Sequence, residues 1–131
     1  MKGRKFMTID EFNSIITKYG KDKILGIVFD NMRVWSLVVP KRDETNPTYP
    51  MKDEDGNKVF YSFDELVTVD SETNSIVIRE YQAGTSAQGR NRLQWDIVTP
   101  VENIQGFRFA PANFTEDQVR YLKEKWDPTV D

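Results

Sequence analysis

Two complete helix-start signals, one near each end of the chain, enclose a central stretch in which apolar and polar residues alternate. At the first signal, Thr8 and Glu11 form a capping box, in which each side chain accepts a hydrogen bond from the main-chain amide of the other residue. Thr115 and Gln118 repeat the pattern near the other end. Apolar residues at helical spacing follow both signals, which predicts two helices. The predicted helices span residues 9–19 and 116–126.

The residues between these helices are typical of short strands separated by turns. Segment 59–69 is ambiguous, because Ser62 can begin a short helical turn and residues 66–69 can form a strand. Consecutive strands with short links pair antiparallel. The sequence therefore predicts a single α+β domain over 1–131, with an N-terminal helix, an antiparallel meander or small open barrel of about five to six strands, and a C-terminal helix. The predicted strands span residues 23–30, 33–39, 75–82, 92–99 and 104–109.

Two polar segments interrupt this pattern. Residues 40–58 contain three prolines and many charges, which indicates a long irregular excursion. Residues 83–91 form a second polar, glycine-bounded loop between two predicted strands. Loops of this kind often carry binding residues, so both segments are predicted to contact a partner. The candidate contact residues in them are Tyr49, Ser86 and Gln88.

The chain contains neither histidine nor cysteine. This absence excludes the Ser-His-Asp triad, the Cys-His pair, zinc fingers and cysteine-ligated iron–sulfur clusters. A serine nucleophile would then need a desolvated lysine as its base, and every lysine has strongly polar sequence neighbours. Paired carboxylates are the only common catalytic equipment that remains. We therefore expect a protein that is not an enzyme.

Charge and hydropathy give little sign of a membrane or of strong electrostatic steering. The formal net charge is −3, so the whole molecule has no general attraction to nucleic acid. The first residues are not followed by the apolar stretch of a secretory signal, and no run approaches the ~18 apolar residues of a membrane span. We expect a cytoplasmic protein that does not associate with membranes.

Two motifs suggest a ligand but are incomplete. Gly84 and Gly89 have the spacing of a phosphate-binding P-loop, but Arg90 and Asn91 stand where the motif needs Lys and Ser or Thr. Residues 53–57 alternate oxygen-bearing side chains as a calcium loop does, without the glycine and glutamate that its register requires. We therefore expect no cofactor and no metal.

Strand alternation suggests a different kind of surface, because residues two apart share one face of a strand. If the three strands that carry them are neighbours, arginines and a tyrosine gather on one outer face, with a further arginine at the adjacent loop edge. Guanidinium groups beside an aromatic ring are suited to gripping phosphates and stacking a base. Asp96 and Glu80 can instead pair with these arginines. The residues concerned are Arg79, Tyr81, Arg92 and Arg108, with Arg90 from the loop.

The tryptophans are assigned by the same alternation. Trp35 and Trp95 each share a face with apolar residues, which predicts core positions. Trp126 lies near the chain end and either seals the last helix onto the sheet or forms an exposed anchor for a partner.

These observations favour a non-catalytic binding module, a small protein-interaction, accessory or inhibitor protein of the kind found in phages and mobile elements. The first alternative is a nucleic-acid or nucleotide-binding protein that uses the arginine-bearing face. The second is an enzyme that depends on carboxylates or a metal. The sequence leaves the partner and the oligomeric state open.

Overall fold

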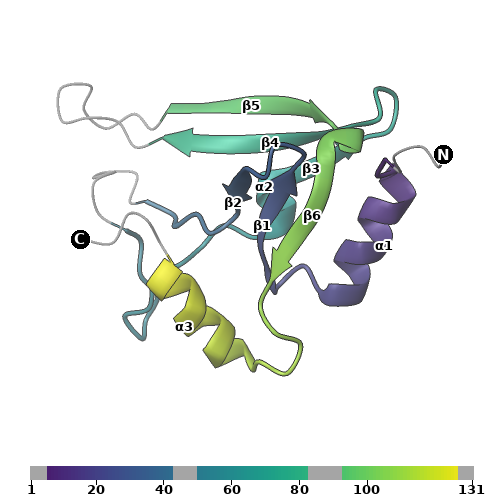
Figure 1. Ribbon diagram of the computed structural model, residues 1–131. Coiled ribbons are helices and arrows are strands. Elements are labelled where there is room, and N and C mark those ends of the chain that lie inside the picture. The colour runs from purple at the N-terminus through teal and green to yellow at the C-terminus, as the bar shows by residue number, and fades with distance from the viewer. Residues whose placement is uncertain (1–5, 43–49, 83–92, 127–131) are drawn as a thin grey trace.

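The computed structural model describes residues 6–42, 50–82 and 93–126 (Figure 1). Six strands form two antiparallel three-stranded sheets, and a helix lies at each end of the described chain. The predicted α+β class and element order are therefore confirmed. The helices are α1 (Ile9–Tyr19), α2 (Phe63–Leu66) and α3 (Glu116–Trp126), with a 3₁₀ helix, η1 (Val101–Asn103). The strands are β1 (Ile24–Phe29), β2 (Val34–Ser36), β3 (Val67–Asp70), β4 (Ser75–Gln82), β5 (Leu93–Pro100) and β6 (Ile104–Phe109).

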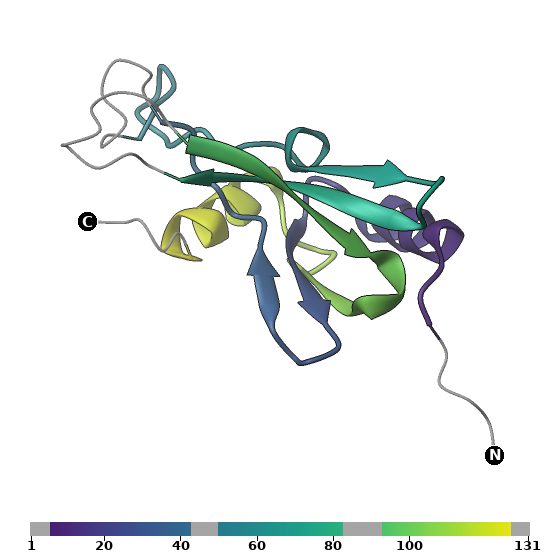
Figure 2. The same cartoon turned by 90° about the horizontal axis from the view of Figure 1, so that it is seen from above.

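The two sheets have the strand orders β2-β1-β6 and β3-β4-β5. They pack against each other and do not close into a barrel, because no strand of one sheet is hydrogen-bonded to a strand of the other. Helices α1 and α3 lie at opposite ends of the domain, as Figure 2 shows from above. The first and last helices therefore contact different parts of the sheet that contains β1.

Each helix begins with the capping arrangement that its sequence predicts. The Thr8 hydroxyl accepts from the Glu11 amide at 3.1 Å, and Glu11 accepts from the Thr8 amide at 3.2 Å. Thr115 and Gln118 make the same pair of bonds at α3. Ser62 caps α2 in the same way, so segment 59–69 forms a helical turn and then strand β3. Both interpretations of that segment hold, one after the other along the chain.

Phe12 of α1 lies at the centre of the main core and is only 1% exposed. Its ring contacts Phe63 of α2 at 6.3 Å and Phe107 of β6 at 5.5 Å between centroids. Buried residues of β1, β3, β4 and η1 complete this core. A smaller cluster holds α3 against the opposite side of β1; it consists of Leu25, Val38, Ala110 and Val119, with Phe60, Phe114 and Leu122 packed around them.

Two connections add detail to the predicted topology. In the β1–β2 hairpin the positive φ lies at Met32 (64°). The loop has three residues, since the Phe29 amide donates to the Arg33 carbonyl, and the third position of such a loop takes the left-handed conformation. The described parts of the excursion at 40–58 contain isolated bridges, which join Pro40 to Phe60, Arg42 to Pro50, and Lys52 to Lys58.

The capping box of α1 is expected to stabilise the fold measurably. Thr8→Ala removes the hydroxyl that accepts from the Glu11 amide, and losing an N-cap costs about 1 kcal/mol. We expect urea denaturation to give a free energy of unfolding lower by that amount. Thr17→Ala is the matched control, because Thr17 is exposed inside the same helix and alanine favours helix. Equal losses in the two variants would contradict the capping role.

Removal of the central ring is expected to be far more damaging. Phe12→Ala leaves a cavity between α1, α2 and β6, and such a change costs about 3–5 kcal/mol. The loss is a large part of the about 5–15 kcal/mol by which a domain is ordinarily stable. We expect a markedly lower melting temperature by circular dichroism. A loss below about 1 kcal/mol would show that Phe12 is not the centre of the core.

Candidate functional site

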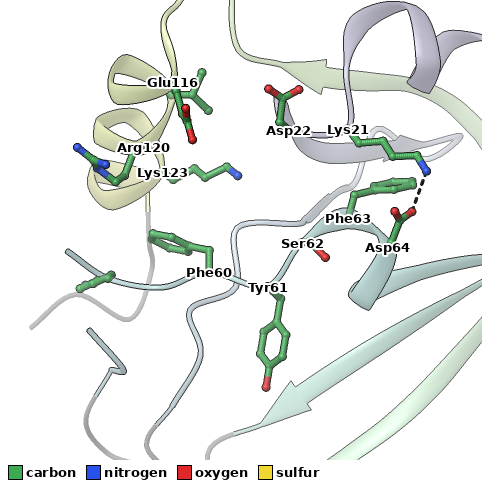
Figure 3. A pocket seen from close by; sticks show the side chains of 12 residues that line it. Lys21, Asp22, Phe60, Tyr61, Ser62, Phe63, Asp64, Glu116, Arg120 and Lys123 are labelled. Carbon is green, nitrogen blue, oxygen red and sulfur yellow. Dashed lines mark hydrogen bonds and ion pairs between the residues drawn. The ribbon is translucent and has the colours of Figure 1, made fainter. Parts of the chain in front are cut away.

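An open groove lies between α3 and the segment that leads into α2 (Figure 3). Its volume is about 430 Å³. Aromatic and aliphatic side chains from both walls line it together with charged groups at its rim. The lining residues are Lys21, Asp22, Lys58, Phe60, Tyr61, Ser62, Phe63, Asp64, Glu116, Val119, Arg120 and Lys123.

Both walls of the groove are held in place by local structure. On one wall the Ser62 hydroxyl accepts from the Glu65 amide at 3.3 Å, and the Glu65 carboxylate accepts from the Ser62 amide at 2.9 Å. This amide bond is the main cause of a lowered pKa at Glu65, and Lys41, 3.2 Å away, adds to it. On the other wall, the buried side chain of Val119 fastens α3 to the second core cluster. The groove therefore has preformed walls.

The charged groups at the rim differ in how well they are paired. Lys21 donates to Asp64 at 2.9 Å, and the guanidinium of Arg120 lies 3.0 Å from Asp117. The Lys123 ammonium has no hydrogen bond or ion pair with any residue that the structure describes. Its side chain points into the groove (Figure 3). Lys123 is therefore the cation of this groove that is available to bind an anionic ligand.

Burial sets the chemistry of this amine. Partial removal from water lowers the pKa of Lys123, and the negative charge of Asp22 opposes that shift. A half-buried ammonium without a direct partner is destabilising, and a carboxylate placed beside it would remove the penalty. The apolar groups of Phe60, Phe63 and Val119 line the same groove. The arrangement therefore suits a ligand that combines an anionic group with an apolar one.

Lys123 was missed by the sequence analysis, which placed every lysine in polar surroundings. Its sequence neighbours are indeed polar, but Val119 lies one helical turn before it. That spacing puts Lys123 beside the apolar stripe of α3 and was the signal available. Only the packing of α3 against the segment at Phe60 shows that this position is half-buried.

The structure places the predicted arginine and tyrosine positions on two different sheets. Arg79 and Tyr81 lie in β4, whereas Arg108 lies in β6. These two strands belong to different sheets, so Arg108 does not share a sheet face with Arg79 and Tyr81. Arg79 forms an ion pair with Asp96 across the strand, as weighed from the sequence, and also donates to Gln94 at 3.2 Å. The described part of the predicted surface does not converge on one site.

Tyr81 and Arg108 each contact an aromatic ring. Tyr81 stacks on Tyr61, with 4.2 Å between ring centroids. The Arg108 guanidinium lies 5.0 Å from the ring centre of Trp126, which is itself about half exposed. Trp126 therefore packs against β6 and also keeps an open face. The other predicted contact residues lie outside the described residues; these are Tyr49, Ser86, Gln88, Arg90 and Arg92.

Trp95 is not in the core, in contrast to its prediction. It lies opposite Glu80 in the β4–β5 pairing and is 41% exposed. Ile78 and Ile97 are the last core residues on the face that Trp95 shares, so Trp95 lies beyond the packed part of that face. The indole N–H donates to Glu80 at 2.6 Å. Trp35, as predicted, packs against the core.

In the acidic turn at residues 53–57, the first carboxylate accepts its hydrogen bonds from the main chain of the turn itself. The Asp53 carboxylate accepts from the amides of Asp55 at 2.9 Å and Asn57 at 3.0 Å, which is a local turn. Across residues 6–42, 50–82 and 93–126 no group of three or more acidic residues is arranged to hold a metal ion. In the same ranges, every helix is too short or too polar to cross a bilayer.

Comparisons with protein families, with curated proteins and with solved structures found no match for this chain.

Because the pKa of Lys123 is lowered in the folded protein, we expect the stability of the fold to depend on pH in a specific way. A lysine whose folded pKa is lowered destabilises the fold fully below that pKa, and the cost fades as pH rises toward the unfolded value of about 10.4. We therefore expect Lys123→Met to raise the free energy of unfolding at pH 7, with a smaller advantage near about pH 10.5. Denaturant titrations of both proteins at several pH values measure this.

Lys125→Met is the control, because Lys125 lies on the exposed side of the same helix. It should show no advantage that shrinks at high pH. An advantage of Lys123→Met that is constant from pH 7 to about pH 10.5 would mean that burial of charge is not its cause.

Proposed function

We propose that this domain is a non-catalytic module that binds another protein through the groove between α3 and the Phe60–Phe63 segment. The single observation that supports it best is the Lys123 ammonium, which faces an open, partly apolar groove and has no direct partner among the described residues. Binding sites commonly retain groups that cost stability in the free protein. A cytosolic location is part of the same proposal, because a chain without cysteine needs no oxidising compartment.

The groove favours an extended segment of a partner over a small catalytic substrate. The Ser62 hydroxyl caps α2 by accepting from Glu65, and the Asp64 carboxylate pairs with Lys21. These two polar groups of the groove wall therefore already have structural roles. An open site with rigid walls, apolar contacts and one unsatisfied charge is typical of peptide recognition.

Charge complementarity identifies the kind of segment. An Asp or Glu side chain of the partner would accept hydrogen bonds from Lys123, and a neighbouring apolar side chain would contact Phe60 and Val119. Asp22 disfavours a second acidic residue close by, because its negative charge lines the same groove and already acts on Lys123. The proposed partner segment thus carries one carboxylate beside apolar residues.

Selection from a random peptide library on the purified full-length protein tests the proposal. We expect enriched peptides to carry a single acidic residue next to an apolar one. Their affinity should fall about tenfold or more in Lys123→Gln, since a hydrogen bond between charged groups contributes about 1.5–3 kcal/mol. Fluorescence anisotropy of labelled peptides gives the affinities.

Lys125→Gln is the matched control, with the same chemical change on the exposed side of α3, and it should leave the affinities unaltered. Peptides that bind wild-type protein and Lys123→Gln equally well would refute the groove as the binding site. A library that yields no binder above background would count against protein binding as a whole.

A further inference from the structure

The four outer edges of the two sheets are very different in length and regularity. Strand β2 has three residues and β3 has four, so each offers a short edge. Strand β6 has six residues, but its pairing with β1 contains two register shifts. Strand β5 has eight residues and pairs with β4 without a shift from one end to the other. It is the outermost strand of its sheet in Figure 1.

Among the described residues, strand β5 has few of the features that usually protect an edge. Natural edges are blocked by lysines, prolines, bulges or covering segments. Over residues 94–100, Asp96 is the only charged side chain and is neutralised by Arg79, while Pro100 lies at the very end. Trp95 on one face and Val98 on the other, which is 61% exposed, leave apolar surface uncovered. A long, regular and apolar edge of this kind is expected to pair with another strand.

Main-chain geometry shows which groups of β5 point outward. The Val101 amide donates to the Asn74 carbonyl, so residues 95, 97 and 99 direct their main-chain groups toward β4. The intervening residues Gln94, Asp96 and Val98 direct theirs away from the sheet. No main-chain partner for these three lies within the described part of the chain. The edge therefore presents a ladder of free donors and acceptors.

We propose that β5 pairs antiparallel with β5 of a second copy of this chain, which joins two three-stranded sheets into one. Over residues 94–100, the three most central positions for a two-fold axis are residues 96–98. A centre at Asp96 sets two carboxylates directly opposite each other, which is unfavourable. A centre at Val98 sets Asp96 opposite Pro100, which has no amide to donate.

A centre at Ile97 separates the two carboxylates and moves Pro100 to the end of the paired segment, opposite Gln94. It pairs Ile97 with its own equivalent, Trp95 with Thr99, and Asp96 with Val98. Outward-pointing main-chain groups then meet outward-pointing groups, and each side chain meets one from the same face of the sheet. Trp95 and Val98, the exposed apolar residues of the edge, each gain a neighbouring side chain from the second copy. This self-match is the reason to assign the edge to a second copy.

The paired edges alone form a small interface. A standard stable interface involves about 20–30 residues on each side, far more than one strand supplies. We therefore expect a dimer that forms reversibly and whose population rises with protein concentration.

Sedimentation velocity over a range of concentrations tests the association. Wild-type protein should shift from monomer toward dimer, and Val98→Lys should weaken the dimer at least tenfold, because a lysine at an edge opposes pairing. Val69→Lys is the matched control: an exposed valine on β3, at the other edge of the same sheet, whose replacement should leave association unchanged. Wild-type protein that stays monomeric at all concentrations overturns the proposal, as does a dimer insensitive to Val98→Lys.

The register is tested by single cysteines, which the absence of natural cysteine makes unambiguous. Residue 97 and its equivalent form a non-hydrogen-bonded pair with Cα atoms about 4.5 Å apart, which a disulfide can span. Ile97→Cys should therefore form a covalent dimer under mild oxidation. Thr99→Cys should not, because its two copies lie roughly 13 Å apart along the strands. Equal cross-linking of both variants, or cross-linking of Thr99→Cys alone, would refute the proposed pairing.

Discussion

The contact of the Phe12 ring with Phe63 and Phe107 is the interaction on which the rest of the structure depends. These three rings come from α1, α2 and β6, which are far apart in the sequence. Their burial brings the first helix, the central helical turn and the last strand to one point. Ile76 and Ile78 of β4 and Ile27 of β1 then close the space between the two sheets. Hydrophobic burial at this one centre therefore sets the position of both sheets.

The limited extent of this core explains the surfaces that remain. On the face of the β4–β5 hairpin that carries Ile78 and Ile97, the two strands extend beyond the core, whereas Tyr81 on the other face packs against it. Trp95 compensates by donating to Glu80, and Arg79 by pairing with Asp96. Cross-strand pairs thus stabilise the part of the hairpin that the core does not reach. Strand β5 is also the last strand of its sheet, so its outer edge has no neighbouring strand among the described residues.

The groove has a separate origin. Helix α3 is held by the small cluster around Val119 and Leu25, on the side of β1 away from the main core. The line of contact between α3 and the segment before α2 is incomplete, and Lys123 faces the space that is left. The proposed groove and the proposed edge use different elements of the fold, α3 in one case and β5 in the other. The two proposed binding surfaces therefore do not overlap.

The sequence alone determined the elements and their order, because caps and alternation act over a few residues. Thr8 with Glu11, and Thr115 with Gln118, mark the starts of α1 and α3 correctly. The same locality explains the pairing of Arg79 with Asp96, which follows from adjacent strands in a hairpin. Such signals were enough for the fold class and for most strand positions.

Tertiary structure alone decided which sheet each strand joins and which polar groups lose water. Arg79 and Arg108 were separated because β4 and β6 belong to different sheets. Trp95 became exposed because its strand outruns the core, and Lys123 became half-buried because a distant segment packs beside it. Each of these outcomes depends on contacts between residues remote in sequence. Periodicity describes the faces of one element and carries no information about what covers them.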